Sequence, residues 1–164
     1  MRKAVLIVLL AALVVASTAT AAVVAQRGDG KLSVSDGRGF VWLQARGVLI
    51  GRVDKGTVTI TDLSPLDETE PLVWGAEKEQ FKGSATVFKG EDIRFRLIGG
   101  QWRISMRGSG IDVSAAARGT VLIQGDGLDT GVYSTSGVDC RTADTKCLPL
   151  PLDQIKLQLG TPTD

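Results

Sequence analysis

The stretch "GFVWLQARGVLIGRVDKGTVTITD", residues 39–62, decides the fold. Apolar and polar side chains alternate along it in short runs, which is the period of a β-strand with one buried face. Gly47 and Gly56 separate these runs, and glycine tolerates the backbone angles that tight turns require. The stretch therefore predicts three short strands, at residues 40–46, 48–53 and 57–61.

The same pattern continues on both sides of this stretch. No segment after the N-terminal region keeps a helical period for three turns, and 20 glycines punctuate the chain. We therefore expect an all-β fold, a single-domain sandwich or barrel of about 9–11 short antiparallel strands. The further predicted strands are 31–35, 85–89, 92–98, 101–107, 111–115, 120–124 and 131–135.

The N-terminal region has the features of an export signal. Arg2 and Lys3 precede an apolar run, and Ala19-Thr20-Ala21 has the pattern that signal peptidase cleaves. Residues 1–25 are thus predicted to be a signal helix, and residues 26–164 the single all-β domain. The alternative is an uncleaved membrane anchor over residues 4–25, which carry no charge and are long enough to cross a bilayer. Both alternatives predict a secreted or extracytoplasmic protein.

The two cysteines lie close together near the C-terminal end. Cys140 and Cys147 enclose "RTADTK", and in an exported chain this spacing predicts a disulfide that closes a short loop. A redox or metal site is the other reading. The spacing is not C-x-x-C, and the chain has no histidine or further thiol to complete a coordination shell.

The absence of histidine narrows the possible chemistry. Without imidazole the chain has no Ser-His-Asp or Cys-His nucleophile and no His-ligated metal. The formal net charge of +1 gives no support for nucleic-acid binding. We expect a protein that is not an enzyme and needs no cofactor, and the remaining enzymatic alternative is a glycan hydrolase that uses two carboxylates.

The segment "GDGLDTG", residues 125–131, invites two functional readings. Asp-Thr-Gly is the triplet of aspartic proteases, but these need a second such triplet, and none follows. Asp126 and Asp129 could offer oxygens to calcium, which is the weak alternative for a metal site. Aspartate and glycine are also the residues of an ordinary turn, and a turn is the prediction.

Four arginines are predicted to share one face of a hairpin. If Gly99-Gly100 forms a two-residue turn, Leu97 faces Trp102 on the buried side. The opposite face then gathers Arg94, Arg96, Arg103 and Arg107. One interpretation is an anion-binding patch, because the forked guanidinium group suits phosphate and carboxylate. The other is an ordinary solvated face.

Two tryptophans complete the candidate ligand-binding residues. Alternation places Val41, Leu43 and Ala45 inward and therefore Trp42 outward, where its ring could stack on a sugar or a partner protein. Trp74 lies in the acidic connection at residues 62–80. It belongs either to a binding loop or to the end of the core.

A partial duplication is visible in the sequence. "GFVWLQARG" at residues 39–47 aligns with "GQWRISMRG" at residues 100–108, and "KGTVTI" and "RGTVLI" follow in turn. Two similar three-strand units that pack face to face would explain this, and chance similarity between β-meanders is the alternative.

The runs "GRGFVWLQARGVLIGRVDKGTVTITD" and "RISMRGSGIDVSAAARGTVLIQG" resemble those of small exported β-rich proteins of high-GC Gram-positive bacteria. The resemblance spans about residues 37–125, rests on no diagnostic motif and carries over no functional residue. It implies an exported bacterial protein.

These features favour a non-enzymatic, secreted or envelope-associated β-domain with a structural or interaction role. The alternative is a module that binds a carbohydrate or anionic polymer. The predicted partners are an anionic envelope polymer, a lipid headgroup or another envelope protein, without nucleic acid. A membrane is contacted only through the N-terminal segment, if that segment is not cleaved.

Overall fold

A computed structural model describes residues 29–161, so the predicted signal or anchor lies outside the described residues. Seven strands form one sheet in which every pair is antiparallel, which confirms the all-β prediction. The elements are β1 (Gly30–Asp62), β2 (Leu72–Trp74), β3 (Lys78–Lys82), β4 (Ala85–Gly125), β5 (Val132–Ser134), η1 (Asp144–Lys146), β6 (Leu148–Pro149) and β7 (Ile155–Leu159). Within residues 29–161, no helix has the length and hydropathy needed to cross a membrane.

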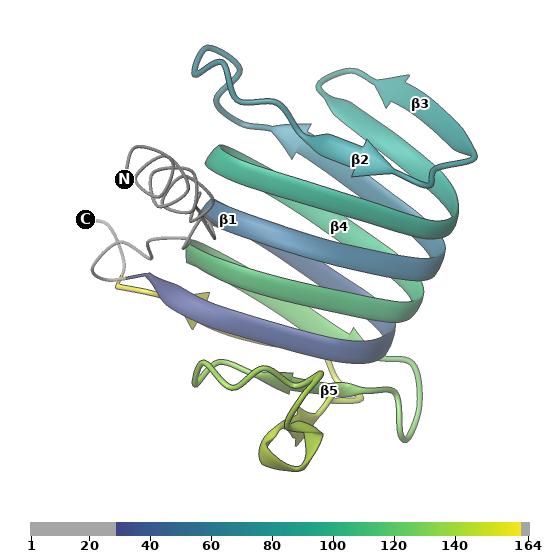
Figure 1. Cartoon of the computed structure of the whole chain (residues 1–164), viewed down its shortest axis with the longest axis vertical. Helices are drawn as coiled ribbons and strands as arrows, with labels where there is room; N and C mark the ends of the chain where they lie inside the picture. Colours follow the sequence, from purple (N-terminus) through teal and green to yellow (C-terminus); the bar gives the residue numbers. More distant parts are fainter. Residues whose placement is uncertain (1–28, 162–164) are drawn as a thin grey trace, which may run out of the picture.

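Two strands are far longer than predicted. β1 has 33 residues and β4 has 41, and each contains several of the runs predicted as separate strands. Figure 1 shows both strands wrapping around the molecule as stacked bands, with sharp bends at the side. Most of these bends contain glycine, which turns the strand without ending its hydrogen bonding. The expectation of many short strands is wrong for this reason.

β1 and β4 form one long hairpin. Its pairing runs from Thr61 opposite Ala85 back to Gly30 opposite Ala117, with small shifts at the bends. β2 and β3 lie in the connection between the two arms, and each pairs with β4.

The long hairpin is wound upon itself into two layers. Residues 39–62 pair a second time with residues 102–125, so each turn of the hairpin bonds to the next turn. A wound hairpin in two layers is the plan of jelly rolls. Layer A consists of residues 30–37, 48–53, 93–98 and 111–117, with β2 at one edge and β5 and β6 at the other. Layer B consists of residues 39–46, 56–62, 85–90, 101–108 and 118–125, with β3 and β7 at its edges.

Apolar side chains from both layers fill the space between them. Val41, Leu43 and Ala45 are buried as predicted. Trp102 is fully enclosed, and its Nε1–H donates a hydrogen bond to the Gly99 carbonyl at 2.7 Å. Trp74 is 51% exposed, so the reading that placed it at the end of the core is wrong. The largest of the other enclosed side chains are Phe95, Leu49, Ile93, Leu97, Ile104, Met106, Ile111, Ile123 and Leu159.

The duplicated segments lie side by side. Gly39 is opposite Gly108 and Arg46 is opposite Gln101, so residues 39–46 and 101–108 are antiparallel neighbours in layer B. The units therefore interleave instead of stacking face to face. Winding a hairpin places corresponding parts of its two arms in the same layer. The duplicated segments are therefore neighbours within layer B.

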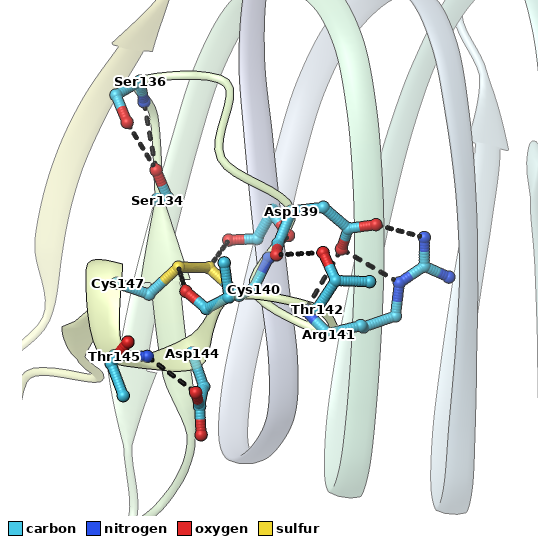
Figure 2. Close-up of a disulfide and its surroundings, with 11 residues drawn as sticks. Ser134, Ser136, Asp139, Cys140, Arg141, Thr142, Asp144, Thr145 and Cys147 are labelled. Atoms are coloured by element: carbon cyan, nitrogen blue, oxygen red, sulfur yellow. Dashed lines mark hydrogen bonds and ion pairs between the residues drawn. A yellow bond between two sulfur atoms is a disulfide. The ribbon is translucent and has the colours of Figure 1, made fainter.

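The predicted disulfide is present (Figure 2). Cys140 and Cys147 are joined through sulfurs 2.02 Å apart, and Cys140 is buried. The Cys140 N–H donates to Ser33 Oγ at 3.0 Å, which holds the loop against β1. Nearby, the Arg141 guanidinium donates to the carboxylate of Asp139 and holds the pKa of that carboxyl below its usual value.

Candidate functional site

The hairpin predicted at Gly99-Gly100 does not form. These two glycines instead carry β4 from layer A to layer B, and β1 lies beside β4 on both sides of the bend. Arg96 lies opposite Ile50 in layer A, whereas Arg103 lies opposite Gln44 in layer B. The inward and outward directions were predicted correctly, but the cross-strand pairs were not. The four arginines therefore divide between two faces of the molecule.

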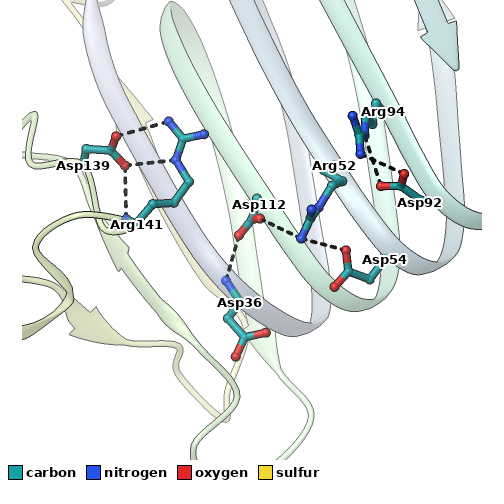
Figure 3. Close-up of polar contacts among 8 residues, drawn as sticks. All are labelled: Asp36, Arg52, Asp54, Asp92, Arg94, Asp112, Asp139 and Arg141. Atoms are coloured by element: carbon teal, nitrogen blue, oxygen red, sulfur yellow. Dashed lines mark hydrogen bonds and ion pairs between the residues drawn. The ribbon is translucent and has the colours of Figure 1, made fainter. Parts of the chain in front are cut away.

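Two of the three arginines of layer A are paired with acids (Figure 3), whereas Arg96 forms no ion pair with a described residue. Arg94 forms an ion pair with Asp92 at 2.9 Å. Its neighbour Arg52 contacts Asp54 at 2.9 Å and Asp112 at 3.6 Å. Charges that are compensated in this way attract an external anion weakly, so Arg52 and Arg94 contribute little to anion binding on this face.

The outer face of layer B has a different composition. Its central strands carry Phe40, Trp42 and Gln44 beside Arg103, Ser105 and Arg107. The five adjacent strand segments are residues 39–46, 56–62, 101–108, 118–125 and β7. None of their outward side chains is acidic. We call this surface the aromatic–arginine face. Its flanking members are Thr57 and Thr59 on one side and Thr120, Leu122, Gln124, Lys156 and Gln158 on the other.

Neutral neighbours hold the two arginines of this face in place. The Arg107 guanidinium lies over the Phe40 ring, 4.3 Å from its centroid. Arg103 donates from Nε and Nη2 to Gln44 Oε1 at 3.3 and 3.1 Å. An aromatic ring and an amide position a guanidinium without cancelling its charge. Both arginines thus remain available to an anion beside the half-buried Trp42.

A hollow lies at each end of the strand segment 39–46. The Gly39 hollow, of about 600 Å³, is lined by Phe40 and Arg107 of the face and by Arg38, Lys55 and Asp126, among others. The Gly47 hollow, of about 830 Å³, is lined by Trp42, Gln44 and Lys156 of the face and by Arg46, Arg118 and Asp29, among others. Because each hollow shares residues with the aromatic–arginine face, the three form one continuous surface.

Some cations of the hollows already have acidic partners. Lys55 contacts Glu91 at 3.0 Å, and this hydrogen bond raises the pKa of Lys55. Arg118 contacts Asp29 at 2.9 Å. Arg38 is exposed, and its backbone is held in the bend by its N–H, which donates to the Thr130 carbonyl at 2.8 Å.

No family model, curated protein or solved structure matches this chain. The resemblance to small exported proteins of high-GC Gram-positive bacteria therefore stays a prediction. The geometry and chemistry of the surface are the basis for proposing a ligand.

The structure brings together half of the predicted ligand-binding residues. Trp42, Arg103 and Arg107 lie on adjacent strands of layer B. Trp74 lies opposite Arg94 in layer A, so the two candidate tryptophans do not share a site. The remaining candidate, Arg96, also belongs to layer A.

Sequence reasoning missed several residues of this surface. Alternation from Trp42 indicates that Gln44 also points outward, so the sequence pattern could have identified Gln44. The sequence pattern could not identify Lys156 and Arg38, because their positions depend on how β7 and the first bend pair with distant strands.

The segment with Asp126 and Asp129 forms a connection between β4 and β5, as the turn reading predicted. The Asp126 N–H donates to the Arg38 carbonyl at 3.1 Å, and Asp129 has a φ of 53°. Over residues 29–161, no group of three or more metal-ligating side chains is present. The segment serves to hold the bend at Arg38.

Proposed function

We propose that this protein is a non-enzymatic binding domain of the cell exterior and that its aromatic–arginine face binds an anionic carbohydrate polymer. The observation that carries the proposal is the acid-free surface on which Trp42 lies beside Arg103 and Arg107. An indole ring offers a flat apolar surface to the C–H face of a sugar. A guanidinium group bonds sulfate, phosphate or carboxylate through two parallel donors.

The distribution of carboxylates supports binding over hydrolysis. Glycan hydrolysis in its usual form needs two carboxyl groups that face each other across a cleft. The aromatic–arginine face contributes none. Each hollow is lined by one carboxylate, and that of Asp29 is ion-paired with Arg118.

The disulfide supports a location outside the cytoplasm. Cys140 and Cys147 form the kind of bond that persists in oxidising compartments and is rare where thiols are kept reduced. In such a location the domain would meet the charged glycopolymers of the envelope.

Retention on immobilised polymers tests the proposed function. We expect the protein to be retained on a sulfated or uronate-bearing glycan and to pass through neutral dextran. Trp42→Ala and the double variant Arg103→Ala/Arg107→Ala should each weaken binding about tenfold or more, since a tenfold change corresponds to ~1.4 kcal/mol.

The opposite layer supplies matched controls of the same residue types. Trp74→Ala and the double variant Arg94→Ala/Arg96→Ala should leave retention nearly unchanged. If the variants of layer A and those of the aromatic–arginine face lose retention equally, the attraction is unspecific and the proposed site is contradicted. Binding to anionic vesicles but to no polymer would indicate a lipid headgroup as the ligand instead.

A further inference from the structure

The two hollows lie at opposite ends of one extended strand segment. Residues 39–47 run from the Gly39 hollow to the Gly47 hollow, with Phe40, Trp42 and Gln44 pointing outward between them. At a rise of ~3.3 Å per residue this segment spans about 26 Å, roughly the length of five linked pyranose rings. A mono- or disaccharide would cover only part of this length.

Cationic side chains mark both ends of the segment. Arg38 and Arg107 line the Gly39 hollow, and Arg46 and Lys156 line the Gly47 hollow. None of these four forms a close ion pair among the described residues, and the charge of Arg46 acts at longer range on Asp67, whose pKa it helps to lower. The middle of the segment offers Trp42 for stacking and the charge of Arg103.

From this arrangement we infer that the face binds the interior of a linear polyanionic glycan about five or more sugar units long, laid along residues 39–47. Its anionic groups contact the cations of both hollows while a central ring stacks on Trp42. This inference rests on the proposed function and adds the length, the direction and the charge spacing of the ligand. The shared chemistry is a chain of sugars that carry sulfate, carboxylate or phosphate at intervals.

Titration calorimetry with heparin-derived oligosaccharides of two, four, six and eight units tests the inference. Affinity should rise steeply with length and level off near six units, with the disaccharide at least about a hundredfold weaker than the octasaccharide. Oligogalacturonates of the same lengths test carboxylate against sulfate. Polyphosphate, which lacks rings, should bind with little dependence on Trp42.

Variants at the two ends separate the subsites. Arg38→Ala and Lys156→Ala should each weaken the octasaccharide several-fold, while each affects the disaccharide much less. Trp42→Ala should weaken oligosaccharides of every length, and Arg96→Ala, on the other layer, should change none.

A disaccharide that binds as tightly as the octasaccharide would overturn the inference and leave a compact site at Trp42 as the proposed function. If only one of the variants Arg38→Ala and Lys156→Ala weakens binding of the octasaccharide, the two-ended arrangement is overturned. Absence of binding at every length would contradict the proposed function itself.

Discussion

Single glycines decide where the long strands bend. Gly108 has a φ of 147°, which side-chain-bearing residues rarely adopt. A Cβ atom there would lie 2.1 Å from the Lys55 carbonyl oxygen of the neighbouring bend. The bend therefore requires glycine for its backbone angle and for the close approach of another part of the chain.

Replacing Gly108 by alanine should destabilise the protein by about 3 kcal/mol or more, because angle strain and backbone overlap act together. Gly83→Ala is the matched control. Gly83 also has a positive φ, of 63°, but nothing lies within 4 Å of the position that a Cβ atom would take. Gly83→Ala should therefore lower the free energy of unfolding by only ~1–2 kcal/mol. Urea unfolding of both variants gives the comparison, and equal losses would show that the contact with Lys55 is unimportant.

At the scale of elements, the disulfide loop fastens the edge of layer A. The bond between Cys140 and Cys147 closes a short loop, and the Cys140 N–H ties that loop to Ser33 of β1. The loop belongs to the connection between β5 and β6, which pair with each other at this edge of the sheet. We expect the bond to stabilise the domain without shaping the two layers.

Reduction of the disulfide should lower the free energy of unfolding by ~2.5 kcal/mol, from the chain entropy that a loop of this size restores to the unfolded state. The far-UV circular dichroism of the native protein should not change. Urea midpoints with and without reductant measure the effect. Ser33→Ala, which removes the hydrogen bond and keeps the disulfide, separates the two contributions. An unchanged midpoint on reduction would contradict the expectation.

At the scale of the whole molecule, the wound hairpin links every part of the core to distant segments. Gly30 pairs with Ala117, and Thr61 pairs with both Ala85 and Arg103. Neither layer has its own continuous segment of chain, because β1 and β4 pass through both. The two layers should therefore form and unfold together.

We expect a single cooperative unfolding transition. Refolding should be slow, in milliseconds to seconds, because long-range pairing costs the entropy of loop closure before most native contacts have formed. Fluorescence of the enclosed Trp102, in a variant that lacks Trp42 and Trp74, reports on the core. Far-UV circular dichroism reports on both layers. Urea curves from the two probes should coincide, and separate midpoints would show that part of the coil unfolds independently.

The sequence alone determined the local features of this protein. Strict alternation identified the inward side chains, such as Leu43 and Phe95, because neighbouring residues of a strand always point to opposite faces. The spacing of Cys140 and Cys147 predicted their bond, since so short a loop closes with little help from the rest of the fold.

Only the tertiary structure decided which side chains share a surface. A local hairpin at Gly99-Gly100 and a bend between layers require the same glycines and the same alternation, so sequence pattern cannot separate them. The choice depends on pairing between β1 and β4, whose partners are far apart in the chain. That pairing placed Arg94 and Arg96 in layer A and Arg103 beside Trp42 in layer B, and it thereby created the face to which we assign the function.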